Sequence, residues 1–100
     1  MNDERAPDLD RTLRDSVGQA PWSMLESHAK RGGLLFVSSR IDLVEVAIAI
    51  AEDRSQAVAG WMGEGLLTRP TSEELVGNGA APDTEWTFVI VQPYVLVSRP

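Results

Sequence analysis

The most apolar stretch of the chain, DLVEVAIAIAED at residues 42–53, carries one internal carboxylate, Glu45. Apolar surroundings raise the pKa of a carboxyl group, and this is one way in which proteins prepare a general base. His28, the only histidine, could act as its partner. Glu45 and His28 are therefore weak catalytic candidates. We favour the competing interpretation, in which Glu45 lies at the open end of an element or pairs with an arginine such as Arg40.

Asp42 and Glu45 are the weak candidates for binding a metal ion. A chain with one histidine and no cysteine cannot build the usual zinc sites, and it has no HExxH or EF-hand spacing. Strand alternation would also place Asp42 and Glu45 on opposite faces. We therefore expect neither a metal nor another cofactor, and the balance of observations favours a protein that is not an enzyme.

Aromatic side chains suggest binding rather than catalysis. Trp22, Trp86 and Tyr94 are candidate contacts for a protein partner, because Trp86 opens the last expected strand and Tyr94 follows the break at Pro93. Exposed aromatics beside an unpaired sheet edge are a common means of association. The alternative is that these side chains are buried in the core.

The charge balance argues against some partners. Nine basic and fifteen acidic residues give a net charge of −6, which repels nucleic acid. No run approaches the roughly 20 apolar residues that a membrane-spanning helix requires. The charged N-terminal sequence and the absence of cysteine indicate a cytoplasmic protein. We therefore expect no nucleic-acid partner and no membrane partner.

Periodicity predicts the elements that must position these residues. The spacing of Leu9, Leu13 and Val17 predicts a helix, and a second helix over 21–31 would end at the Gly-Gly pair that follows. Capping-box patterns predict two more helices, one starting at Asp53 with Gln56 and ending at Gly65, the other starting at Thr71 with Glu74. Extended segments are expected at 34–38, 66–70 and 85–98, the last broken by Pro93 at an edge or bulge.

The run 43–51 has two interpretations. As a strand it alternates β-branched residues with small ones, and it would form an antiparallel hairpin with 34–38. As a helix it would be apolar nearly all round and would need burial on every side. We favour the strand and keep the helix as the alternative.

These elements define an α+β fold, with a small, mainly antiparallel sheet and helices packed on one face. Residues 8–100 are expected to form a single globular domain, preceded by a disordered tail over 1–7.

Three segments together resemble a known family. DLVEVAIAIAED, VAGWMGEGLLTRP and PYVLV are similar to the small bacterial proteins of domain-of-unknown-function family 2288. The resemblance runs from about Pro21 to Val97. It implies a bacterial protein of about this length, and it implies no activity and no catalytic positions.

Two hypotheses of function follow. The first is a non-enzymatic protein-interaction or regulatory module that binds a protein partner or associates with itself, with a homodimer as one form. The alternative is a small enzyme or a ligand- or metal-binding domain that uses Glu45, Asp42 and His28. The relative positions of Glu45 and His28 distinguish the two.

Overall fold

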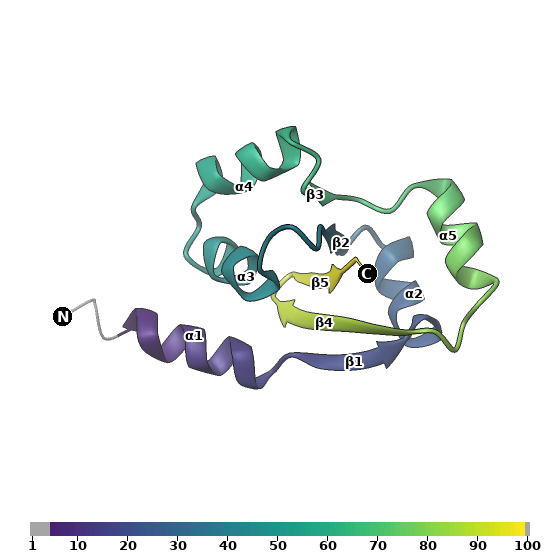
Figure 1. The fold of residues 1–100 in the computed structure, drawn as a ribbon, viewed down its shortest axis with the longest axis horizontal. Coiled ribbons are helices and arrows are strands. Elements are labelled where there is room, and N and C mark those ends of the chain that lie inside the picture. Colours follow the sequence, from purple (N-terminus) through teal and green to yellow (C-terminus); the bar gives the residue numbers. More distant parts are fainter. Residues whose placement is uncertain (1–4, 100) are drawn as a thin grey trace.

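The computed structural model describes the backbone of residues 5–99 and the side chains from Leu9 to Arg99. Five strands form one sheet in the order β1-β4-β5-β2-β3. The strands are β1 (Gly18–Pro21), β2 (Leu34–Val37), β3 (Leu67–Thr68), β4 (Glu85–Val91) and β5 (Tyr94–Ser98). The helices are α1 (Arg5–Asp15), α2 (Trp22–Lys30), α3 (Leu43–Ala51), α4 (Ser55–Gly63) and α5 (Ser72–Gly79). Figure 1 shows α1 and α5 at opposite ends of the sheet.

The sheet is mainly antiparallel. β4 pairs antiparallel with β1 and with β5, and β2 pairs antiparallel with β3. Only β2 and β5 run parallel, with Leu34 opposite Val95. The predicted α+β class with a mainly antiparallel sheet is therefore confirmed.

Both faces of the sheet are buried by helices. In β2, Leu35 and Val37 belong to one buried cluster, which includes residues of α1 and α3, while Leu34 and Phe36 belong to a second cluster with α2. We call these sides the α3 face and the α2 face. The helices are thus divided between two faces, whereas the sequence pattern predicts them on one. The reason lies in the sequence of β2, LLFV, which has no polar residue to leave in water.

The run 43–51 forms helix α3, so the predicted strand and its hairpin with 34–38 are wrong. This helix packs against β4 and β5 on one side and against α1 and α4 on others. An all-round apolar helix is stable when it is covered in this way, and its alanines favour the helical backbone. Its buried residues are Leu43, Val44, Val46, Ala47 and Ala49.

The predicted long strand over 85–98 is two strands joined by a turn. Pro93 lies in this turn with Gln92, and not at an edge or a bulge. A turn position needs no ladder hydrogen bond from the missing N–H of proline. β4 and β5 then pair through Val91 and Tyr94 at the start of the hairpin.

The helix ends agree in part with the predicted capping patterns. The capping box of α5 is confirmed, because Thr71 Oγ1 accepts from the Glu74 N–H at 3.0 Å and Glu74 Oε1 accepts from the Thr71 N–H at 2.9 Å. Gly65 ends α4 at a φ of 75°. The capping box expected at Asp53 does not form. Asp53 takes a φ of 60° in the corner between α3 and α4, and α4 begins at Ser55.

The first helix begins earlier than expected. Helix α1 begins at Arg5, so residues 5–7 of the expected tail are helical, while residues 1–4 lie outside the described part. Gly18 opens strand β1 opposite Phe88. The segment GNG at 77–79 completes α5. Among the described helices, none is long and apolar enough to cross a membrane.

Leu96 in the central strand β5 tests the core. We expect Leu96→Ala to lower the free energy of unfolding by about 2–5 kcal/mol, because its side chain is fully buried and a cavity remains. Val76→Ala on α5 is the control and should cost less than about 0.5 kcal/mol, because Val76 is 74% exposed. Urea unfolding followed by circular dichroism measures both. Equal losses would contradict the assigned burial.

Candidate functional site

An apolar groove lies between α2 and β4 on the α2 face. It encloses about 150 Å³, and we call it the α2–β4 groove. Its lining residues are Ala20, Met24, Leu25, His28, Phe88, Ile90 and Val95. Two large apolar side chains on its walls are open to water, Met24 at 66% and Ile90 at 49% exposed. Exposed apolar side chains on both walls of one groove mark a surface that can bind another molecule.

Strand alternation places Ile90 in this groove. Phe88 and Ile90 face α2, while Val89 and Val91 between and beyond them are buried on the α3 face. β1 pairs with β4 only as far as Phe88, and β4 continues to Val91. In the described chain no strand covers this last part of β4 on the β1 side. Ile90 therefore stands at an unpaired length of sheet edge.

His28 lies at the other wall of the groove, one helical turn after Met24. Its Nδ1 lies 3.3 Å from Arg31 Nη2, which can donate a hydrogen bond to it. The half-buried imidazole of His28 and its neighbour Arg31 thus form a polar rim beside the apolar groove. No carboxylate is among the residues that line this groove.

The three predicted partner-binding aromatics lie in different environments. Trp22 is fully buried and stacks on Phe36, with ring centroids 6.2 Å apart, so it offers no surface to a partner. Trp86 is half-buried and packs against the same pair, at 5.9 Å from Trp22. The indole N–H groups of Trp22 and Trp86 are buried and lack hydrogen-bond partners among the described residues.

Tyr94 is half-buried on the other side of the sheet. It lines an apolar pocket of about 270 Å³ with residues of α3 and α4, including Ile50, Val58 and Met62. Trp61 is also only partly buried, and it packs against the cluster on the α3 face. Tyr94 thus contributes to a surface separate from the α2–β4 groove.

The structure separates the candidate residues for catalysis and metal binding. Glu45 is exposed on α3 and lines a hollow of about 430 Å³ that includes Asp10 and Glu52, whereas His28 lies on α2 across the sheet. Asp42 occupies the N-cap position of α3, but its carboxylate accepts from Arg14 at 3.1 Å. Within the described residues, no group of three His, Asp or Glu side chains is arranged to hold a metal ion.

Arg14 joins α1 to the start of α3. Its Nε donates to Asp10 at 2.5 Å and its Nη2 donates to Asp42 at 3.1 Å. These two carboxylates, Asp10 first, raise the pKa of Arg14 above its ordinary value. Asp42 is thereby held in an ion pair and does not cap α3 with its side chain.

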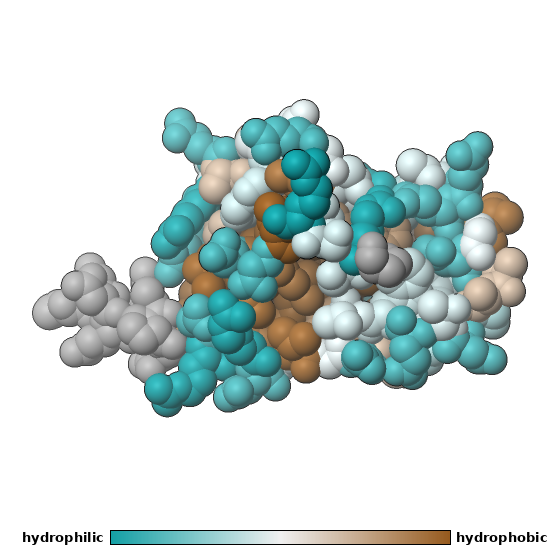
Figure 2. Space-filling view, viewed as in Figure 1, coloured by the Kyte–Doolittle hydropathy of each residue, from teal (hydrophilic) through white to brown (hydrophobic). Residues whose placement is uncertain are grey.

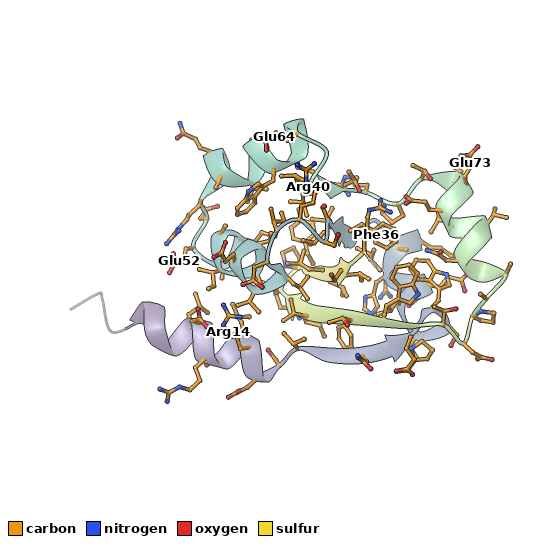
Figure 3. The ribbon with its side chains drawn as sticks, viewed as in Figure 1. Arg14, Phe36, Arg40, Glu52, Glu64 and Glu73 are labelled. Carbon is orange, nitrogen blue, oxygen red and sulfur yellow. The ribbon has the colours of Figure 1, made fainter. Side chains whose placement is uncertain are left out.

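A wide hollow opens where α3 begins, and we call it the α3 hollow. It measures about 670 Å³ and lies over the part of the α3 face that the helices leave uncovered. Its apolar floor consists of Val17, Ile41, Leu43 and Val44, and its polar wall of Arg14, Ser39, Arg40, Asp42, Thr87 and Ser98. Figure 2 shows brown apolar atoms between the teal side chains over α1 and those over the loop after β2. Arg14 and Arg40 come from these two elements (Figure 3).

Sequence reasoning missed the residues of both surfaces except His28 and Asp42. A signal was present for the α3 hollow. Thr87 and Ser98 are hydroxyl residues on strand positions whose neighbours on the same face, Val89 and Leu96, are buried and apolar. Polar residues at the end of an otherwise apolar strand face indicate that the helices no longer cover the sheet there.

These arrangements do not give Glu45 the surroundings of a general base. Arg14 and Asp42 near α3 are partly exposed and paired, and the α2–β4 groove has one titratable side chain, His28. A poised general base needs partial burial and a hydrogen-bonded partner, and Glu45 is exposed to solvent.

Comparison with known proteins identifies the class. The family model for proteins of unknown function DUF2288 matches residues 8–99, and the chain belongs to this family. The NMR solution structure of PA1075 from Pseudomonas aeruginosa is similar, with a TM-score of 0.77 and 31% identity, over 91% of this chain and 83% of that one. The comparison with curated proteins found no match. These findings establish family and fold and point to no specific role.

Glu74 supports a prediction on pH and stability. Its carboxylate accepts from Arg99 Nη1 at 2.6 Å, and this hydrogen bond is the main reason why its pKa lies below the ordinary value of 4.5. When folding lowers the pKa of a carboxyl group, the ionised group stabilises the folded state at pH values above its pKa in the unfolded chain. This stabilisation is lost as the pH falls through the lower pKa of the folded state.

We therefore expect Glu74→Gln to lower the free energy of unfolding by up to about 1 kcal/mol at pH 7, because the pair is partly exposed. Glutamine keeps the Oε1 acceptor of the capping box, but its NH2 group cannot accept from Arg99 Nη1, so the charge and that hydrogen bond are removed together. The difference from the unmodified protein should shrink steadily below about pH 4.5. Urea unfolding at pH 7, 5 and 3 measures it. A difference that is independent of pH would contradict this account.

Proposed function

We propose that the protein is a non-enzymatic interaction module that associates with a second copy of itself through the α2–β4 groove. The observation that carries the proposal is Ile90, 49% exposed in the part of β4 that β1 does not pair. An apolar side chain of this size at a strand edge gains from burial against a partner.

A second copy fits this edge for a geometric reason. An unpaired strand edge carries alternating N–H and C=O groups, and two identical edges satisfy each other when they meet antiparallel about a two-fold axis. With the axis near Ile90, the three residues Val89–Val91 of each copy would pair and the sheet would continue across the interface. Ile90 of each copy would then lie close to Met24 of its partner.

The charge distribution also fits. The chain has a net charge of −6, so two copies repel one another on average. The groove, however, is lined by apolar side chains and His28, so close contact there brings no carboxylates together. A groove with this lining is the type of surface on which an acidic protein can self-associate.

The cellular setting belongs to the same proposal. We place the module in a bacterial cytoplasm. The bacterial assignment is supported by the solved relative from Pseudomonas aeruginosa, and the cytoplasmic one rests on the sequence alone.

The proposal predicts a dimer that a single charge abolishes. We expect sedimentation velocity at tens of micromolar to give twice the chain mass of 10.9 kDa for the unmodified protein. Ile90→Lys should sediment as a monomer, because the interface would have to bury an ammonium group. Met24→Lys on the opposite wall should have the same effect.

Val76→Lys is the matched control, because it changes an exposed apolar residue on α5, away from the groove. It should remain dimeric. An unmodified protein that stays monomeric at several hundred micromolar would refute self-association. A dimer that survives both groove variants would show that another surface is used.

A further inference from the structure

The α3 hollow, on the opposite face of the sheet from the α2–β4 groove, has the chemistry of a small-molecule site. We infer that it binds a small organic monoanion, with a carboxylate head at Arg40 and an apolar body on the floor formed by Ile41, Leu43 and Val17. This inference does not depend on the proposed dimer, because the two surfaces share no residue.

The charges of the wall favour one negative charge. Arg14 is already engaged by both Asp10 and Asp42, so its guanidinium is not free for a ligand. For Arg40, the described side chains from Leu9 to Arg99 provide no ion-pair partner. Figure 3 shows Arg40 on the loop that precedes α3. Arg40 is thus the guanidinium of the hollow that has no carboxylate partner among the described side chains, and it offers a place for an anion.

The same wall discriminates against a doubly charged head. Asp42 lines the hollow with Arg40, and a phosphate dianion there would meet its carboxylate as well as the field of an acidic protein. A carboxylate carries one charge and can receive two parallel hydrogen bonds from a guanidinium. The charge balance therefore selects a carboxylate.

Hydroxyl groups and apolar side chains supply the rest of the site. Thr87 and Ser98 project from β4 and β5 into the hollow where no helix covers the sheet, and Ser39 adjoins Arg40. They can donate hydrogen bonds to the head, and the apolar floor can bury a short chain. The volume of about 670 Å³ lies within the usual range for small-molecule sites, about 300–1,000 Å³.

Three probes separate the parts of this site. Hexanoate carries both the head and the chain, acetate carries the head alone, and hexanamide carries the chain without the charge. We expect proton–nitrogen NMR titrations to show saturable shifts with hexanoate at the amides of Arg40, Leu43 and Thr87. Acetate and hexanamide should each bind at least about fivefold more weakly.

Two variants of the wall should act in opposite directions. Arg40→Gln should weaken hexanoate binding about fivefold, because an exposed ion pair is removed. Asp42→Asn should strengthen it, because a repelling carboxylate is replaced by a neutral residue that is also favoured at helix N-caps. Arg11→Gln, which changes an exposed arginine on α1 outside the hollow, is the control and should leave the affinity unchanged.

The amide spectra of the variants report directly whether each remains folded. Shifts that do not saturate, that are equal for hexanoate and acetate, or that persist unchanged in Arg40→Gln would overturn the inference. Saturable binding of inorganic phosphate at the same amides, tighter than that of hexanoate, would overturn the choice of a monoanion.

Discussion

The burial of α3 is the constraint on which the rest of the molecule depends. A helix as apolar as Leu43–Ala51 must be covered on most of its surface, and here β4, β5, α1 and α4 provide the cover. The sheet needs α3 in return, because Val89 and Leu96 would otherwise face water. The α3 hollow exists because this helix starts short of the end of the sheet, and so leaves Thr87 and Ser98 uncovered.

Local patterns in the sequence predicted local structure well. The helix that contains Trp22, the capping box of Thr71 and Glu74 and the glycine stop at Gly65 were all foreseen, because each depends on residues a few positions apart. The strand predicted at 43–51 failed because an alternating run of β-branched and small residues also suits a helix that is enclosed on several sides. That enclosure comes from α1, α4 and the C-terminal strands, which no local window contains.

The candidate site was harder to predict than the fold. Glu45 was a candidate because it is a lone carboxylate in an apolar run. In the folded protein, however, even a largely buried helix keeps a narrow stripe exposed to solvent, and Glu45 lies on that stripe. Exposed residues such as Met24, Ile90 and Arg40 have no unusual sequence context. Their importance depends on where strands and helices end in the folded protein. β4 extends beyond its partner β1, and the loop after β2 places Arg40 at the rim of an uncovered part of the sheet. The two faces of one sheet thus present an apolar groove and a charged hollow.

The parallel pairing of β2 with β5 has a consequence for synthesis of the chain on the ribosome. β5 lies in the middle of the sheet, yet it follows the other four described strands in the chain, and most of the chain separates Leu34 of β2 from its partner Val95 of β5. Until β5 leaves the ribosome, β2 and β3 cannot join β4 and β1, and both faces of β2 lack their complete cover. Such non-local pairing delays folding and keeps apolar strands exposed to other nascent chains and chaperones until β5 has been made.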